Sequence, residues 1–337
     1  MKTINLILGA FAVALASTTA SAQTAVKFSL DWKYEGTQAP FLLAIDKGYF
    51  KAEGLDVTVD TSGGSVEPIN RIASGTYDMA FADINSMVKF RDQNPQIPLK
   101  AVYMVYNSPP FAIVGRKSKG ITDPKSLEGK KLGAPAPDGA YAQWPIFVSA
   151  NKIDAAKVTI MNIGFPVREP MLVAGDVDAI TGFSFSSYIN VKYSGIPQED
   201  IVTLLMSNYG LKLYGNAVMV SPKFAAEKPD AVKAFLRAFN KALKDTAKNP
   251  AEAIASVLKR NEVAKKDVEL DRLQIALRDN IITPEVKANG LGGVDMERMT
   301  AAIDQIAVTY TFKNAKPAPA DIFDASFLPP AAERSLQ

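Results

Sequence analysis

Short alternating apolar runs and helical stretches follow one another along most of the chain. Residues 25–30 alternate as in a strand, the apolar residues of 40–53 recur at helical spacing, and residues 55–59 alternate again. Pro40 suits the first turn of a helix, and Gly54 suits its end. The pattern predicts an opening strand–helix–strand unit.

Further strands and helices are predicted in the same alternating order. The predicted strands cover residues 77–81, 99–105, 110–114, 132–135, 158–161 and 216–220, and the predicted helices cover 66–74, 123–127, 142–151, 251–259, 266–280, 294–308 and a stretch from 229 onwards. Strands that alternate with helices predict an α/β fold with mostly parallel sheets and ligands at the carboxyl ends of the strands. The proline-rich residues 316–337 are expected to cover the surface.

One helix-to-strand junction occurs twice. Residues 71–80 and 171–180 each contain a short helix, a glycine, an aspartate three residues later and a buried strand, and Glu-Pro precedes each helix. Junctions of this kind are common, so the repeat is explained either by coincidence or by two similar lobes. In the second case each lobe uses the junction to bring a strand end to a cleft.

The composition excludes several kinds of chemistry. The chain of 337 residues contains no histidine and no cysteine, and its formal net charge is +3. It cannot use a Ser-His-Asp triad, a thiol nucleophile, or histidine and cysteine metal ligands. It has no phosphate-binding glycine loop and no basic stripe, so we expect no cofactor, no metal and no nucleic acid partner.

The first 22 residues have the features of a secretory signal peptide. Lys2 precedes an apolar run over residues 6–16, and small residues stand at 20–22, before the expected cleavage site at Gln23. The run is too short to span a bilayer, and no later segment reaches the required length. Because no cysteine is available for lipid attachment, we expect a free periplasmic protein without a lipid anchor.

The opening unit resembles that of a known group of proteins. Asp31, Trp32, the helix after them and residues 47–57 are similar to the start of solute-binding proteins of bacterial ATP-driven (ABC) importers. The resemblance is to the subfamily that groups binders of thiamine pyrimidine precursors, sulfonates and nitrate with thiamine pyrimidine synthases. It implies a binding protein rather than an enzyme, with a membrane permease and an ATPase as partners.

The same resemblance implies the two-lobed type II periplasmic binding protein fold, with two chain crossovers and a cleft between the lobes. We expect the crossovers near residues 106–111 and 211–215. The first lobe would contain residues 25–108 and 216–337, and the second lobe residues 109–215. A ligand that bridges the lobes would shift the hinge equilibrium towards the closed form.

The chain departs from the synthases at the residues that those enzymes use for chemistry. The synthases consume a histidine of their own and hold iron through histidine and cysteine, whereas this chain has neither and carries Gln38 in the opening turn. Pyrimidine synthesis by that route is excluded. A secreted enzyme that acts on a pyrimidine-like amine through Asp or Glu stays open, as does a sensor subunit for the same ligand.

The resemblance also implies a set of site residues in loops at the strand ends. They are Asp31, Trp32, Tyr34, Glu35, Gly63, Gly64, Ser65, Asp83, Asn85 and Tyr106 from the first lobe, and Asp138, Gly139, Trp144, Phe183 and Ser184 from the second. Structural roles compete with some of them, because Trp144 could pack in a core and Asp83 could cap a helix. Phe183 and Phe185 are expected to alternate as in a strand, one facing the core and the other the cleft.

The candidate set is rich in aromatic rings and carboxylates. Nitrate or a small sulfonate needs donors and little aromatic surface, whereas a heteroaromatic amine needs stacking rings and carboxylates. Arg168 and Lys33 are the candidate cations, and residues 63–65 either form an ordinary turn and helix cap or offer free backbone N–H groups to an anion. The set favours a thiamine pyrimidine precursor or related heteroaromatic ligand, with sulfonate, nitrate or an aromatic carboxylate as the alternatives.

Overall fold

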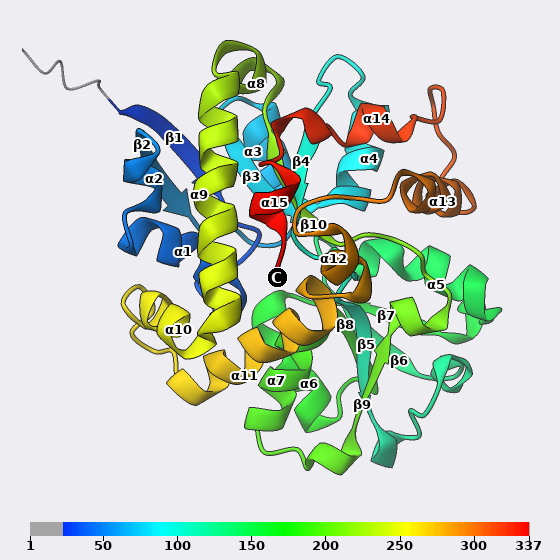
Figure 1. Cartoon of the computed structure of the whole chain (residues 1–337). Coiled ribbons are helices and arrows are strands. Elements are labelled where there is room, and N and C mark those ends of the chain that lie inside the picture. Colours follow the sequence, from blue (N-terminus) through cyan, green and yellow to red (C-terminus); the bar gives the residue numbers. More distant parts are fainter. Residues whose placement is uncertain (1–22, 337) are drawn as a thin grey trace, which may run out of the picture.

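The computed structural model describes residues 23–336 and contains two separate five-stranded sheets (Figure 1). The predicted signal peptide lies outside the described residues. The first sheet contains β1 (Thr24–Ser29), β2 (Leu55–Asp60), β3 (Met79–Asp83), β4 (Lys100–Met104) and β10 (Asn216–Val220). The second contains β5 (Phe111–Arg116), β6 (Lys131–Ala134), β7 (Thr159–Asn162), β8 (Ala179–Phe183) and β9 (Ile201–Leu205).

The two sheets share one topology. Their strand orders are β2-β1-β3-β10-β4 and β7-β6-β8-β5-β9. In each sheet one strand, β10 or β5, is antiparallel to both of its neighbours, so the sheets are mixed and the expectation of mostly parallel strands holds only for the other four. The antiparallel strand is the one that follows a crossover. A chain that enters a sheet from the cleft side has to run away from the cleft.

The repeated junction has the same hydrogen bonds in both lobes. Asp78 Oδ2 accepts the backbone N–H of Lys27 at 2.8 Å, and Asp178 Oδ2 accepts that of Lys131 at 2.9 Å. Each acceptor therefore ties the start of its strand to the neighbouring parallel strand. With the shared strand order, this equivalence favours two similar lobes over coincidence. The second helix starts earlier than predicted, however, so that Pro170 lies inside it.

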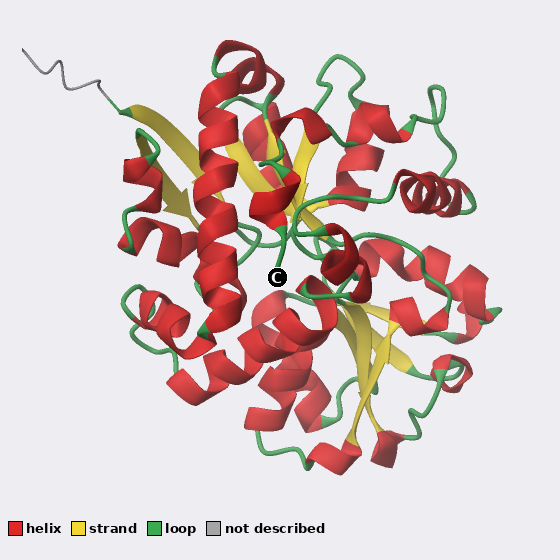
Figure 2. Ribbon diagram, in the orientation of Figure 1, coloured by secondary structure: helices red, strands yellow, loops and turns green. Residues whose placement is uncertain are grey.

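Helices surround both sheets (Figure 2). They are α1 (Ala39–Asp46), α2 (Tyr49–Ala52), α3 (Val66–Ala73), α4 (Ile84–Gln93), α5 (Trp144–Asn151), α6 (Phe165–Ala174), α7 (Ser184–Tyr193), α8 (Pro222–Glu227), α9 (Pro229–Lys248), α10 (Pro250–Leu258), α11 (Lys266–Ala276), α12 (Pro284–Asn289), α13 (Met296–Ala307), α14 (Pro319–Ile322) and α15 (Ala331–Arg334). The sequence did not predict β9 or the helices α4, α7, α8, α12, α14 and α15. The helix predicted over residues 40–53 is divided in two at Gly48, whose φ of 68° is left-handed. Among the described helices, none is both long and apolar enough to cross a membrane.

The chain crosses between the sheets twice, and the two crossover segments lie side by side. The backbone N–H of Gly215 donates to the carbonyl of Tyr106 at 2.9 Å. A Cβ at position 215 would come within 2.8 Å of the Tyr106 Cβ, so this approach requires glycine. From α13, the Arg298 guanidinium donates to the carbonyls of Asn107 (2.8 Å) and Leu213 (2.7 Å), one in each crossover. The predicted two crossovers are confirmed, whereas the boundaries of the lobes stay a prediction.

Candidate ligand-binding site

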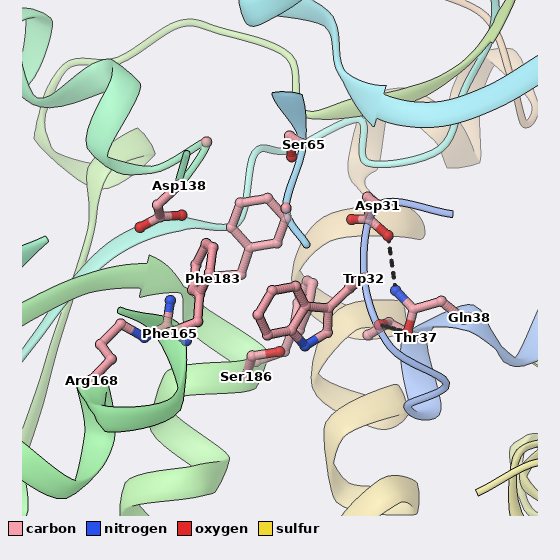
Figure 3. A pocket seen from close by; sticks show the side chains of 13 residues that line it. Asp31, Trp32, Thr37, Gln38, Ser65, Asp138, Phe165, Arg168, Phe183 and Ser186 are labelled. Atoms are coloured by element: carbon pink, nitrogen blue, oxygen red, sulfur yellow. Dashed lines mark hydrogen bonds between the residues drawn. The ribbon is translucent and has the colours of Figure 1, made fainter. Parts of the chain in front are cut away.

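A pocket of about 420 Å³ lies between the two sheets, where loops at their strand ends face one another (Figure 3). Residues from the segment after β1 lie on one side, and residues from α6 and the ends of β6 and β8 lie on the other. The lining consists of Asp31, Trp32, Thr37, Gln38, Gly64, Ser65, Asp138, Gly139, Phe165, Arg168, Phe183, Phe185 and Ser186.

The two sides of the pocket touch at its rim. The rings of Trp32 and Phe165 meet edge to face, with centroids 4.7 Å apart. A Cβ at Gly64 would lie 3.1 Å from the carbonyl oxygen of Pro137 and 3.3 Å from the Phe165 ring. Gly64 and Trp32 follow strands of the first sheet, while Pro137 and Phe165 follow strands of the second. The cleft is therefore closed in this structure.

Asp31 places a buried carboxyl group at the pocket. It is only 4% exposed, and its oxygens accept hydrogen bonds from Gln38 Nε2 (3.0 Å) and Asn216 Nδ2 (2.8 Å). Burial, with a smaller effect from the charge of Glu35, raises the pKa of Asp31 to about 7 against the lowering effect of these two bonds. Near neutral pH this carboxyl group is present in both protonation states, so it can donate a hydrogen bond as well as accept one.

Asp138 and Arg168 form the polar part of the opposite side. Asp138 accepts hydrogen bonds from Thr181 Oγ1 (2.7 Å) and the backbone N–H of Ala140 (3.1 Å), and burial raises its pKa. Arg168 is 4% exposed, and both its Nε and its Nη2 donate to Glu169 Oε1. The guanidinium charge is thus balanced inside the protein by Glu169 and by nearby Asp138.

Seven of the predicted site residues line this one pocket. They are Asp31, Trp32, Gly64, Ser65, Asp138, Gly139 and Phe183. Arg168, which the sequence offered as a candidate cation, lines it as well. Their contact with a ligand stays a prediction.

The other eight predicted residues lie outside the lining: Tyr34, Glu35, Gly63, Asp83, Asn85, Tyr106, Trp144 and Ser184. Asp83 is fully buried and caps α4 by accepting the backbone N–H groups of Asn85 and Ser86, so the capping interpretation is confirmed. Trp144 is 7% exposed and belongs to the hydrophobic core. Tyr106 is buried behind the pocket, where its ring packs against Phe185.

The turn before α3 differs from the expected anion site. The N–H of Gly63 donates to Glu67 Oε2 (2.6 Å), and that of Gly64 donates to the carbonyl of Asp31 (3.1 Å). These donors are occupied, so of the two alternatives for this turn the one with free N–H groups fails at both glycines. The Ser65 hydroxyl makes no capping bond to α3, and Ser65 lines the pocket instead.

Five lining residues were absent from the predicted set: Thr37, Gln38, Phe165, Phe185 and Ser186. The expected strand alternation of Phe183 and Phe185 is wrong, because α7 begins at Ser184 and both rings reach the pocket. Gln38 could have been found, since this polar residue stands in the opening turn that also carries Asp31 and Trp32. No local signal marked Phe165.

Similarity to known proteins identifies the family. Residues 36–253 match the family described as NMT1/THI5 like. The chain belongs to the NMT1/THI5-like family. This membership confirms the resemblance on which the site residues were chosen.

Characterised relatives of this NMT1/THI5-like protein include binding proteins and enzymes. It is 29% identical to the formylaminopyrimidine-binding protein of Halalkalibacterium halodurans, over 82% of this chain and 85% of that protein. It is 26% identical to the riboflavin-binding protein RibY of Chloroflexus aurantiacus, over 64% of this chain and 60% of RibY. It is 23% identical to the 4-amino-5-hydroxymethyl-2-methylpyrimidine phosphate synthase of Schizosaccharomyces pombe, over 67% of each chain.

Solved structures share the whole fold. The periplasmic aliphatic sulphonate binding protein SsuA of Escherichia coli superposes with a TM-score of 0.71 at 12% identity, covering 90% of this chain and 99% of SsuA. At that identity the likeness shows the fold alone. It confirms the prediction of a type II periplasmic binding protein fold.

Proposed function

We propose that this NMT1/THI5-like protein is the substrate-binding component of an ABC importer and captures a thiamine pyrimidine precursor or a related neutral heteroaromatic molecule. The observation that carries the proposal is one pocket that combines aromatic rings with buried carboxyl groups. Trp32, Phe165 and Phe183 supply ring surface for stacking, and Asp31 and Asp138 supply hydrogen-bonding oxygens.

The chemistry of Asp31 suits an aminopyrimidine. Such a ring presents an exocyclic amine that donates and an adjacent ring nitrogen that accepts. A protonated carboxyl group offers the complementary acceptor and donor, and burial brings Asp31 within reach of that state at neutral pH. Gln38 and Asn216 hold the carboxyl group in place by hydrogen bonds to its two oxygens.

This pocket is less suited to an anionic ligand than to a neutral one. The cation that lines it, Arg168, already pairs with Glu169, and the N–H groups of Gly63 and Gly64 are occupied. An added sulfonate or nitrate would face Asp31 and Asp138 without an uncommitted positive charge among the described lining residues. Sulfonate, nitrate and aromatic carboxylates are therefore the alternatives.

The relatives support a heteroaromatic ligand and a binding role. Formylaminopyrimidine and riboflavin, which name two of the relatives, both contain nitrogen heterocycles.

The synthase relatives are enzymes. Because this chain has no histidine or cysteine, we infer binding without synthesis and keep a secreted, carboxylate-dependent enzyme as the alternative. Within residues 23–336, no group of three or more Asp and Glu side chains is placed so that it could hold a metal ion.

We infer a periplasmic location from the signal-like N-terminus and delivery to a membrane permease and its ATPase from the importer resemblance. Lobe closure would present the loaded form to the permease.

Isothermal titration calorimetry tests the ligand class. The mature chain would be titrated separately with formylaminopyrimidine, 4-amino-5-hydroxymethyl-2-methylpyrimidine, riboflavin, an alkanesulfonate and nitrate. We expect saturable one-to-one binding of a pyrimidine, with the compound recovered unchanged by chromatography. Binding of the sulfonate or nitrate alone would overturn the ligand class, and conversion of the pyrimidine would establish the enzyme alternative.

A further inference from the structure

Arg272, on α11, is a buried cation that lies outside the pocket lining. It is only 2% exposed, and its guanidinium sits between two carboxylates, Glu269 (3.1 Å) and Glu35 (3.4 Å). Burial of a charge is costly unless ion pairs and hydrogen bonds replace its hydration. The position of Arg272 therefore depends on the partners that surround it.

The remaining partners of Arg272 lie on α7, after the second sheet's β8. Its Nη2 donates to Asn190 Oδ1 at 3.0 Å, and its Nη1 lies 3.4 Å from the backbone carbonyls of Phe185 and Ser186. Phe185 and Ser186 line the pocket. The guanidinium thus contacts the outer side of the pocket wall.

Glu35 belongs to the opposite side of the cleft. It follows β1 and stands next to the turn that carries Thr37 and Gln38, two further lining residues. Ser186 Oγ donates to Glu35 Oε2 at 3.3 Å, so Glu35, Ser186 and Arg272 form one cluster across the cleft.

Helix α11 itself is held against the first lobe. The N–H of Gly36 donates to Glu269 Oε2 at 2.6 Å, and a Cβ at Gly36 would come within 2.1 Å of the Glu269 carbonyl oxygen. In Figure 1, α11 runs from α10 towards α7. If α11 moves with the first lobe, opening separates Arg272 from α7. If it moves with the second, opening separates Arg272 from Glu35. Either motion breaks the cluster.

We propose that Arg272 is a positioning residue that holds the cleft closed by tying the Glu35 turn of one lobe to the first turns of α7 in the other. The contacts of this cluster that bridge the lobes form on closure, so they add to the closing equilibrium for every ligand alike. The consequence for affinity rests on the proposed ligand capture, whereas the consequence for closure does not.

Single-molecule Förster resonance energy transfer measures the fractions of open and closed molecules directly. The chain has no cysteine, so dyes can be attached to an introduced pair, Lys223→Cys on α8 and Glu199→Cys near β9. Both positions are exposed, and α8 and β9 lie at opposite ends of the molecule in Figure 1. The closed-to-open ratio would be measured without ligand and with increasing formylaminopyrimidine.

Two variants and one control separate the positioning role from general damage. Arg272→Met removes the guanidinium, and pairing it with Glu269→Gln limits the uncompensated buried charge. Asn190→Ala removes one acceptor on α7 and leaves the pair of Arg272 with Glu269 intact. Arg278→Met is the control, because Arg278 lies on the adjoining turn, is exposed and pairs with its neighbour Asp279. Circular dichroism and thermal melting establish that each variant is folded.

We expect the ligand-free closed-to-open ratio to fall about tenfold in Arg272→Met/Glu269→Gln and less in Asn190→Ala, with no change in Arg278→Met. The apparent Kd for two pyrimidines of different substitution should rise by the factor by which the ligand-free closed fraction falls. An unchanged ratio in both folded test variants would overturn the proposal. If formylaminopyrimidine fails to bind even the unaltered protein, the proposed ligand is wrong, while the ligand-free ratio still decides the role of Arg272.

Discussion

Trp32 and Phe165 meet edge to face across the cleft, with ring centroids 4.7 Å apart and ring planes inclined by 67°. Trp32 follows β1 of the first sheet, and Phe165 begins α6, which follows β7 of the second sheet. A contact between the two lobes thus forms part of the pocket wall. Closure and the shape of the binding site are consequently a single event in this protein.

The fluorescence of Trp32 should respond to ligand binding, whereas that of Trp144 should not. Trp32 lines the pocket, whereas Trp144 is 7% exposed in the core. We expect the ligand-dependent change in intrinsic fluorescence to disappear in Trp32→Phe and to persist in Trp144→Phe. Calorimetry of Trp32→Ala should show a loss of about 0.5–1.5 kcal/mol in pyrimidine binding, the usual size of an aromatic stacking term. A response that is lost only with Trp144 would place the ligand elsewhere.

Gly64 should be required for closure. It has a φ of 109°, and a Cβ there would press on Pro137 and Phe165 of the opposite lobe. Gly64→Ala should weaken ligand binding by about tenfold, because only closure brings the added Cβ against Pro137 and Phe165. The backbone strain of about 1–3 kcal/mol acts on folding. Gly75→Ala is the matched control, since Gly75 has a φ of 75° and open space around it. It should lower the melting temperature and leave the Kd unchanged. Equal Kd values for both variants would contradict the closure argument.

Asp31 should make stability depend on pH. Its pKa in the folded protein, about 7, is above its ordinary value of 3.8, so between these values the folded state keeps a proton that the unfolded chain loses. The contribution of Asp31 to stability therefore falls as the pH rises from about 4 to about 7, by up to about 1.4 kcal/mol per pH unit, and is constant above that range. The carboxylate of Glu35 and the hydroxyl of Tyr106 also lie close to the Asp31 carboxyl group.

Urea unfolding of Asp31→Asn checks this dependence. The variant cannot ionise, so its stability relative to the unaltered protein should increase from pH 4.5 to pH 7 and then level off. Rotation of the Asn216 amide can supply an acceptor for the new N–H₂ group, because Asn216 Oδ1 has no hydrogen-bond partner within residues 23–336. Asp56→Asn, at an exposed position on β2, should show a flat difference over the same range. If the stability difference for Asp31→Asn is also independent of pH, the pKa of the Asp31 carboxyl group is not raised in the folded protein.

Arg298 should stabilise the hinge. Its guanidinium donates to one carbonyl in each crossover, pairs with Glu285 (2.8 Å) and lies over the Tyr214 ring. Arg298→Ala should lower the free energy of unfolding by about 1.5–3 kcal/mol, as expected for hydrogen bonds to a charged group. Arg278→Ala removes an exposed arginine whose ion pair is with its sequence neighbour Asp279, and it should cost under about 1 kcal/mol. A similar loss of unfolding free energy in the two variants would show that the contacts of Arg298 with the crossovers do not stabilise the protein more than an exposed ion pair does.

Local pattern was enough to predict much of the fold. Alternation marked strands such as β1 and β2, left-handed glycines such as Gly54 marked helix ends, and the repeated aspartates Asp78 and Asp178 marked equivalent junctions. The residues that form each of these signals are close together in the chain, so the signals can be recognised from the sequence alone. Where a local choice was balanced, as at Phe183 and Phe185, the prediction failed because α7 starts one residue after β8 ends.

The sequence by itself therefore determined the family, the two-lobed α/β fold, and seven lining residues that follow strand ends. Its lack of histidine and cysteine also determined which chemistry is absent. Only the tertiary structure brought Phe165 against Trp32 and Arg272 against Glu35. Those contacts join residues from opposite lobes or from the far C-terminal helices, and they depend on how the lobes and α11 pack together. No periodicity within a short segment carries that information, since packing is a property of surfaces that meet only in the folded chain.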